Sequence, residues 1–321
     1  SMSEAGPIDS AAVTPLDALP PGGRIVSVGT FDGVHLGHQH LLRRAVDRAR
    51  ELGVRALAVT FEPPPPAVLR PDRFAGRICE PDDKLRAIAA AGVDEITIIP
   101  FTRDYSRTSP EHFMADLSRC THLRELWVGE GFALGKDRAG DIPRLTAIGQ
   151  DLGFAVVALP RIAIGDETVS SSEIRRAIEA GDARKAWRLL GRPFRVSGEV
   201  VEGQKVGREL GFPTANVAPP PDLVLPADGI YAAWAWLPGD AAPRPAVTYV
   251  GKRPAVNTGE RMIETHLLDF DADIYGQILR VDLLDRVRPD ANFPSVDALI
   301  AQVEVDKADA RRILAEVAAE R

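Results

Sequence analysis

The sequence predicts an α/β domain with a parallel sheet, followed by an antiparallel β-barrel domain with terminal helices. From Arg24 onward, short β-branched runs alternate with helical stretches, which is typical of parallel strands joined by helical crossovers. From Phe194 onward, alternating polar and apolar runs are separated by Gly, Pro and Asp without helical crossovers, which indicates antiparallel strands. The length of 321 residues suits two domains of roughly 150 residues each.

The elements expected in the first domain follow from periodicity and from signals at their ends. Glu80 and Asp82 offer N-terminal caps, Gly92 a stop, and Pro110 a first helical turn. The proline run at 63–66 fits neither a helix nor a central strand and is expected to be a loop. The expected strands are 24–28, 55–61, 95–99, 125–128 and 154–159, and the expected helices are 38–52, 82–91, 110–120 and 141–152. This order predicts a parallel sheet with helices on both faces.

Two short helices, 171–179 and 182–190, lead to a domain boundary near Gly191. The strands expected after it are 194–201, 230–236, 246–250, 262–270 and 278–284. Five or six such strands suggest a small barrel. The chain is expected to end in two helices, 295–303 and 307–319.

Composition and charge narrow the class of protein. Lys and Arg number 39 against 46 Asp and Glu, a net charge of −7 that argues against a protein coating nucleic acid. The stretch 1–23 lacks the basic and apolar segments of a signal peptide and is expected to be a flexible tail, followed by domains at 24–190 and 191–321. No apolar run reaches the length of a bilayer span, and Cys79 and Cys120 provide no disulfide framework. We expect a cytoplasmic enzyme without membrane or nucleic-acid partners.

The stretch 27–42, SVGTFDGVHLGHQHLL, is a candidate phosphate site in the first domain. A strand ends at Gly29 and a helix begins near His38, so ligands can meet both a strand's carboxyl end and a helix N-terminus. His35 and His38 flank Gly37, and two imidazoles can donate hydrogen bonds to charge that develops on a phosphate. Incidental polar residues at a helix start and a zinc site are the alternatives. His40 is expected to be an exposed bystander.

The run HLGH at 35–38 after TFDG at 30–33 resembles the nucleotidyltransferase superfamily, with a Rossmann-like fold. More narrowly, it is similar to the FMN adenylyltransferase module of the bacterial bifunctional riboflavin kinase/FAD synthetase family. The run SSSEIR at 170–175 matches a second motif of the superfamily. The resemblance implies that His35, His38 and Arg175 are catalytic. It further implies that ATP is bound by Gly29, Phe31, Asp32, Gly37, Ser171 and Ser172.

This chain departs from the resemblance at a few positions. Similar proteins often carry His where Pro64 stands, and Asp or Asn where Gly131 stands. They also carry Phe-Arg-Phe-Gly where this chain has FALG at 132–135. An active kinase with weak or redirected adenylyl transfer is therefore an alternative.

The second domain opens with a glycine-rich stretch, GEVVEGQKVGRELGFPTAN at 198–216. The backbone N–H groups of its glycines and the side chains of Lys205 and Arg208 can surround phosphates, although no Walker A sequence is present. Thr214 and Asn216 lie two residues apart, so in an extended segment they share one face and can hold Mg²⁺ and a nucleotide oxygen. Without further context, an ordinary turn followed by a strand explains this stretch equally well.

Together with LP at 225–226, GIY at 229–231 and ETHLLDF at 264–270, this stretch resembles the riboflavin kinase family. The resemblance implies that Glu264 is a general base for the ribityl hydroxyl and that Thr214 and Asn216 position Mg²⁺ and ATP. The nucleotide-binding residues it implies are Lys205, Gly207, Arg208, Gly211, Pro213, Thr214 and Asn216. A structural salt bridge is the alternative for Glu264, and His266 either lines the pocket or is a core histidine. Arg311 and Arg312 are expected on a solvated helix face.

The sequence thus predicts a bifunctional enzyme that acts on flavins. The barrel would phosphorylate riboflavin to FMN with ATP and Mg²⁺, and the α/β domain would join FMN to AMP from ATP, making FAD and releasing pyrophosphate. We expect small-molecule substrates (riboflavin, FMN and ATP) and a monomer or weak homo-oligomer. A non-catalytic flavin-binding protein is a further alternative, against which the combination of Glu264, His35, His38 and Thr214 argues.

Overall fold

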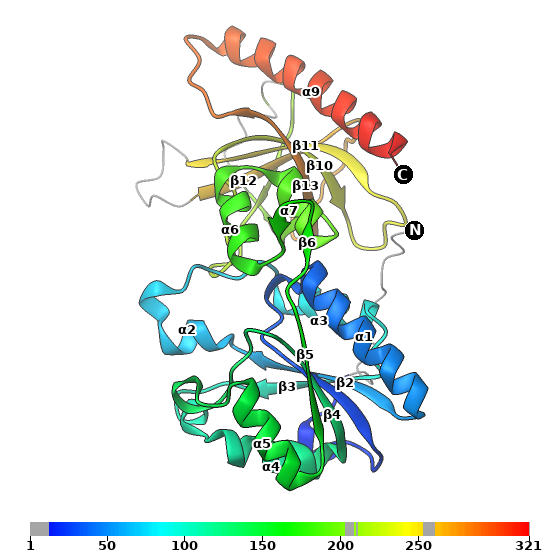
Figure 1. Cartoon of the computed structure of the whole chain (residues 1–321). Coiled ribbons are helices and arrows are strands. Elements are labelled where there is room, and N and C mark those ends of the chain that lie inside the picture. The colour runs from blue at the N-terminus through cyan, green and yellow to red at the C-terminus, as the bar shows by residue number, and fades with distance from the viewer. Residues whose placement is uncertain (1–12, 203–208, 210, 253–260, 321) are drawn as a thin grey trace. The chain divides into compact units, whose positions relative to one another are not determined.

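The computed structural model describes residues 13–202, 209, 211–252 and 261–320. The chain divides into two compact units, Ser1–Ser171 and Ser172–Arg321, which are described separately (Figure 1). Helix α7 (Ala183–Leu190), and all of α6 (Ser171–Ala180) except its first residue, fall in the second unit. The sequence instead suggests a domain boundary near Gly191, which remains a proposal.

The first unit is a five-stranded parallel sheet in the order β3-β2-β1-β4-β5. Its strands are β1 (Arg24–Val28), β2 (Arg55–Glu62), β3 (Glu95–Pro100), β4 (Leu123–Gly129) and β5 (Ala155–Leu159). Helices α1 (Leu36–Leu52) and α3 (Pro81–Ala90) cover one face, while α4 (Pro110–Thr121) and α5 (Ile142–Leu152) cover the other. The predicted α/β fold is confirmed. The strand order reverses between β1 and β4, the place where open sheets of this kind bind ligands.

The proline run corrects one sequence-based expectation. Residues 63–66 were expected to be loop, but Pro65 and Pro66 begin helix α2 (Pro65–Leu69). Proline is tolerated in a first helical turn because the N–H that it lacks has no partner there anyway.

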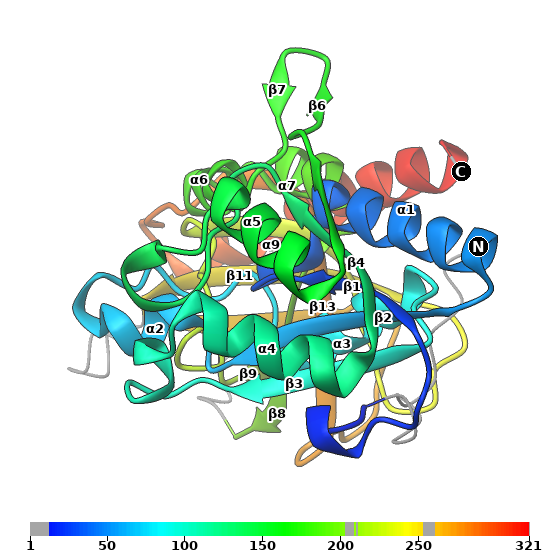
Figure 2. The same ribbon diagram turned by 60° about the horizontal axis from the view of Figure 1, so that its bottom comes forward.

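The stretch before β1 is also more ordered than a flexible tail over 1–23 would be. Val13 bridges to Ile96 of β3, the hydroxyl of Thr97 donates to the Thr14 carbonyl at 2.8 Å, and a 3-10 turn, η2, spans Leu16–Ala18. Residues 1–12 lie outside the described part of the chain. A short hairpin that the sequence analysis did not predict, β6 (Ala163–Ile164) with β7 (Glu167–Thr168), stands away from the sheet (Figure 2).

The second unit is a closed antiparallel barrel in the order β10-β11-β12-β9-β8-β13, which confirms the predicted barrel. Its strands are β8 (Phe194–Val201), β9 (Ala215–Val217), β10 (Gly229–Trp236), β11 (Arg244–Lys252), β12 (Arg261–Leu267) and β13 (Ile278–Pro289). Strand β9 has only three residues, and it completes the ring between β8 and β12. The hydroxyls of Thr248 and Thr265 meet at 3.0 Å, and both side chains are fully buried.

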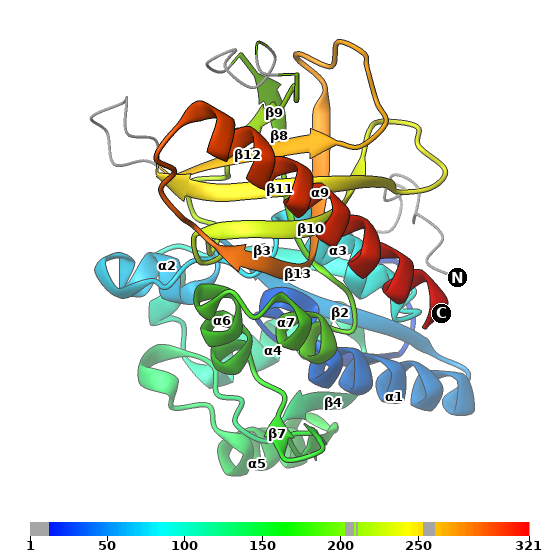
Figure 3. The same cartoon turned by 90° about the horizontal axis from the view of Figure 1, so that it is seen from above.

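The chain ends in one helix, α9 (Val296–Ala319), where two helices were expected. The helix lies across the outside of β10 and β11 (Figure 3), packing Ile313 and Leu314 against Ile230 and Val247. The expected break near residue 305 does not occur. Asp306 is buried within the helix and accepts two hydrogen bonds of 2.9 Å from the Arg288 guanidinium of β13. None of the helices in the described parts of the chain is long and apolar enough to cross a membrane.

Candidate active sites

The first candidate site lies where β1 passes into α1. His35 is the N-cap of α1, and its Nδ1 atom accepts hydrogen bonds from the backbone N–H groups of Gly37 (3.1 Å) and His38 (3.3 Å). Because Nδ1 is an acceptor, the neutral ring carries its proton on Nε2, which leaves that atom as a donor. The cap also explains why the helix begins at Leu36, two residues before the expected start.

The rings of this site are packed face to edge and face to face. The His35 and His38 rings stack with centroids 3.6 Å apart, and the Phe31 ring meets the His38 ring edge-on at 5.4 Å. A Cβ atom at Gly37 would lie 2.9 Å from Cε1 of His35, and one at Gly29 would lie 3.1 Å from the Phe31 ring. The two glycines therefore make room for the rings, a role that the sequence analysis did not foresee for them.

The turn between Phe31 and His35 is held from two sides. The Asp32 carboxylate accepts from the backbone N–H of Ile78 at 3.0 Å, and the Asp32 carbonyl accepts from the Ser171 hydroxyl at 3.0 Å. The structure thus brings Ser171 of the serine motif to the histidine motif. Ser172 and Arg175 belong to the second compact unit, where Ser172 is exposed and burial lowers the pKa of the half-buried Arg175.

Two of the departures from the resemblance, Pro64 and Gly131, lie beyond the ends of β2 and β4. Pro64 is the N-cap residue of α2, close to Glu62, whose carboxylate pairs with Lys84 at 3.1 Å and with Arg77 at 2.7 Å. The Gly131 carbonyl accepts from the Arg138 guanidinium at 3.1 Å. The Pro64 carbonyl accepts from the Ala67 N–H at 2.9 Å, so both positions have local hydrogen-bond partners beyond the carboxyl ends of the strands.

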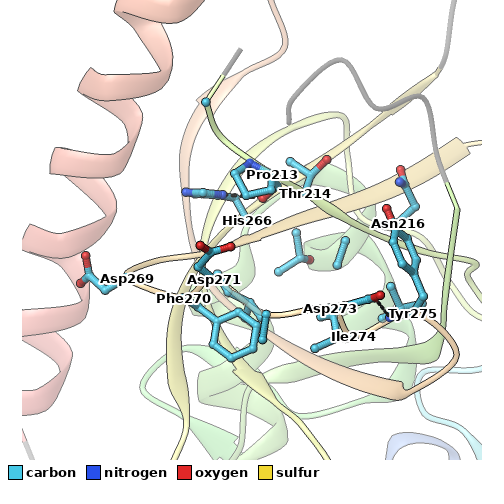
Figure 4. A pocket seen from close by; sticks show the side chains of 16 residues that line it. Pro213, Thr214, Asn216, His266, Asp269, Phe270, Asp271, Asp273, Ile274 and Tyr275 are labelled. Atoms are coloured by element: carbon cyan, nitrogen blue, oxygen red, sulfur yellow. Dashed lines mark hydrogen bonds between the residues drawn. The ribbon is translucent and has the colours of Figure 1, made fainter. Parts of the chain in front are cut away.

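The second candidate site is a cavity of about 920 Å³ in the barrel unit (Figure 4). One wall is the segment 211–216, which contributes Gly211, Pro213, Thr214 and Asn216. The other wall is the loop 269–275 after β12, with Phe270 and Tyr275 among its lining side chains. The structure therefore gathers the described residues of the predicted nucleotide segment around one cavity. Lys205, Gly207 and Arg208 lie outside the described residues.

Glu264 lies on β12 directly opposite Asn216 of β9 in the antiparallel register. Directly opposite residues share a face, with Cβ atoms about 5 Å apart. The Glu264 side chain is half-buried, and it is not one of the described residues that line the cavity. Thr214, two residues before Asn216, is on the same wall of the cavity. Glu264 and Asn216 are thus brought together on two paired strands, and Thr214 lies directly before the second of them.

His266 lines the cavity, and its Nδ1 atom is 2.7 Å from the Pro213 carbonyl oxygen. Desolvation by burial lowers the pKa of His266, and the nearby Lys307 and Arg311 cations act in the same direction. Of the two interpretations of His266 that the sequence leaves open, the structure supports the one in which it faces the pocket.

An ion pair between a cavity wall and the terminal helix was missed by sequence reasoning. Arg311 of α9 donates two hydrogen bonds of 2.8 Å to the carboxylate of Asp269, which lines the cavity on its α9 side (Figure 4). Arg312 instead pairs with Glu316 on the exposed helix face. The motif that carried the resemblance includes Asp269, but its partner lies 42 positions away, so no local pattern indicates the pair.

The donor set of the cavity fits a magnesium ion that accompanies a nucleotide. In the described part of the chain, no group of three or more His, Cys, Asp or Glu side chains is arranged to hold a metal ion. Thr214 and Asn216 offer neutral oxygen atoms, and both line the cavity. Mg²⁺ prefers oxygen and takes most of its ligands from phosphates and water in kinase sites, so two such donors suffice.

Comparison with known proteins assigns a family to each unit. A riboflavin kinase family model matches residues 190–314, and an FAD synthetase family model matches residues 19–173. The bifunctional riboflavin kinase/FMN adenylyltransferase of Escherichia coli strain K12 is 36% identical over 298 residues, covering 92% of this chain and 94% of the relative. The protein of the same description from Pseudomonas fluorescens is 37% identical over 295 residues, covering 91% and 94%.

A solved structure agrees in fold along nearly the whole chain. The crystal structure of a protein described as a macrolide-efflux protein from Streptococcus pneumoniae matches with a TM-score of 0.83 and 29% sequence identity. The match covers 94% of this chain and 99% of that one, so both units have counterparts in it. From the matching family models and relatives it follows that this chain belongs to the family of bifunctional riboflavin kinase/FMN adenylyltransferases.

Proposed function

We propose that the two activities of this family are carried out by two sites, one in the domain at 24–190 and one in the domain at 191–321. The chain phosphorylates riboflavin and adenylylates FMN, both with ATP. The cavity between the segment 211–216 and the loop 269–275 serves the kinase. The junction of β1 and α1 serves the adenylyltransferase. The domains at 24–190 and 191–321 are proposed as the corresponding functional parts of the sequence.

In the kinase site, Glu264 is the general base. Its carboxylate accepts the proton of the terminal ribityl hydroxyl while that oxygen attacks the γ-phosphorus of ATP, and ADP leaves. Thr214 and Asn216 bind the nucleotide and its magnesium ion, which neutralises charge on the phosphates when bound. The observation that supports this assignment is the register that sets Glu264 opposite Asn216.

In the adenylyltransferase site, a phosphate oxygen of FMN attacks the α-phosphorus of ATP, and pyrophosphate leaves. The Nε2–H group of His35 is aimed by the two bonds that its Nδ1 atom accepts, so it can donate to charge that develops on the phosphate. His38 is stacked on His35 and acts beside it. Arg175 and Ser172 are assigned to the departing β- and γ-phosphates by the serine motif.

A chromatographic time course tests the proposal. Protein, riboflavin, ATP and Mg²⁺ are incubated, and riboflavin, FMN and FAD are separated at intervals. FMN followed by FAD is the expected result. FMN that accumulates without FAD would remove the adenylyltransferase assignment and would favour the weakened activity that Pro64 and Gly131 suggest. Absence of both products would favour a non-catalytic flavin-binding protein.

Three finer properties are part of the proposal. Omission of Mg²⁺ from the time course should stop both steps, because each transfers phosphorus from a magnesium-bound nucleotide. The protein is expected to act in the cytoplasm. It is also expected to be a monomer or a weak homo-oligomer, which light scattering coupled to gel filtration measures directly.

A further inference from the structure

The pairing of β9 with β12 includes Asn216 but stops one residue short of Thr214, the other predicted metal ligand of the cavity. The ladder joins Ile263 to Val217, Glu264 to Asn216 and Thr265 to Ala215. Continued by one antiparallel step on each side, the same register would bring Thr214 opposite His266. Pro213 follows on that path and has no backbone N–H to offer. The ladder ends at Ala215, so it does not hold Pro213 and Thr214 in the way it holds β9.

A side chain takes over where the ladder ends. The Nδ1 atom of His266 is 2.7 Å from the Pro213 carbonyl oxygen, and because a carbonyl only accepts, Nδ1 must carry the proton. Thr214 is thereby fixed on both sides, by this bond at Pro213 and by the ladder at Ala215. Figure 4 shows the His266 ring beside Pro213, with Thr214 next along the chain at the cavity.

We propose that His266 is a positioning residue of the kinase site, which holds Thr214 in place for the magnesium–ATP complex through its bond to the Pro213 carbonyl. This inference rests on the proposed function of Thr214. It assigns to His266 no contact with the reacting atoms. Loss of the bond should therefore raise the KM for ATP more than the KM for riboflavin.

Two substitutions at this position separate the hydrogen bond from the bulk of the ring. In His266→Asn the side-chain amide nitrogen takes a place close to that of Nδ1 and can still donate, whereas His266→Leu keeps the bulk and donates nothing. His266→Leu should raise the KM for ATP in riboflavin phosphorylation by roughly threefold to tenfold. The KM for riboflavin should stay unchanged, and His266→Asn should lie within about twofold of the unaltered protein. FAD formation from FMN, assigned to the domain at 24–190, is the internal control.

A double-mutant cycle tests whether the effect passes through Thr214. Thr214→Val removes the hydroxyl, so the addition of His266→Leu to that variant should raise the KM for ATP no further. Additive effects would overturn the proposal, as would an equal rise in both KM values or an Asn variant no better than the Leu variant. Tryptophan fluorescence from Trp234 and Trp236 reports whether the barrel is folded. An unfolded Leu variant would assign His266 a general structural role and would also overturn it.

The failure of this inference is distinguishable from that of the proposed function. If the unaltered protein does not phosphorylate riboflavin, the kinase assignment itself fails. If it does so and His266→Leu leaves the KM for ATP unchanged, only the role of His266 fails.

Discussion

The two sites are assembled over very different distances along the chain. In the α/β unit, His35 bonds to N–H groups two and three residues further on, and its ring stacks on that of His38. In the barrel unit, His266 bonds to a residue 53 positions away and Arg311 to one 42 positions away. The histidines of the first site are positioned locally at a strand-to-helix junction, and only the turn before them is tied to distant residues, Ile78 and Ser171. The second site is a cavity whose walls are themselves tied to distant elements.

This difference predicts how each site responds to change. The junction is held by backbone hydrogen bonds at a helix start and by rings packed on glycines. A substitution there should therefore remove the function of the substituted side chain and leave its neighbours in place. The cavity depends on loops held by single side chains. Substitutions at these ties should alter substrate affinity while the folded barrel persists.

The largest effect is expected from Glu264→Gln. The amide keeps the shape of the side chain but cannot accept the hydroxyl proton, so riboflavin phosphorylation should fall by about 10²- to 10⁴-fold. FMN adenylylation should be unaffected, since none of the residues proposed for the adenylyltransferase lies in the domain at 191–321. Initial rates of the two half-reactions, measured separately, check this. Glu316→Gln, which breaks an exposed pair with Arg312, is the matched control and should leave both rates intact. Full kinase activity in Glu264→Gln would place the base on another residue.

A smaller effect, on the other half-reaction, is expected from His35→Asn. The Asn side-chain oxygen can accept from the same backbone N–H groups as Nδ1 and is a favoured helix cap, so the melting temperature should hardly change. The Nε2 donor is lost, and FMN adenylylation should fall by about 10²-fold while riboflavin phosphorylation is kept. His40→Asn, at an exposed position on the same helix, is the matched control. Adenylyl transfer that survives in His35→Asn would mean that the His35 ring serves the helix rather than the phosphate.

The short-range site was therefore the more predictable of the two. The HLGH run could be identified from local spacing and the serine motif from its resemblance to a superfamily motif, and the structure joins them through the bond from Ser171 to Asp32. The helix start was misplaced by two residues because histidine is outside the usual set of capping residues. The steric reason for Gly37 was also missed. The His35 ring, which belongs to the residue two positions earlier, lies where a Cβ atom of residue 37 would be.

In the barrel, sequence patterns predicted the closed sheet but not the contacts that shape its cavity. Alternation indicated five of the six strands, and the three-residue β9 is too short to show a period. The two expected C-terminal helices are one because Arg288 compensates the buried charge of Asp306, a pairing across 18 residues that helical propensity does not report. The same limit applies to Asp269 and Arg311, whose charges are visible in the sequence while their partnership is not.

That last pair provides the smallest predicted effect and the finest test of the comparison. Both side chains are substantially exposed, and exposed ion pairs contribute little to stability because water screens the charges. Arg311→Met should therefore lower the kinase kcat/KM for riboflavin by roughly twofold to fivefold, by loosening the loop at 269–275. Because salt screens exposed charges, the variant and the unaltered protein should converge as ionic strength rises. Arg312→Met, one residue on and bonded away from the cavity, should show no difference at any salt concentration. A loss in Arg311→Met that high salt does not diminish would mean that Arg311 acts on the substrate itself rather than through Asp269.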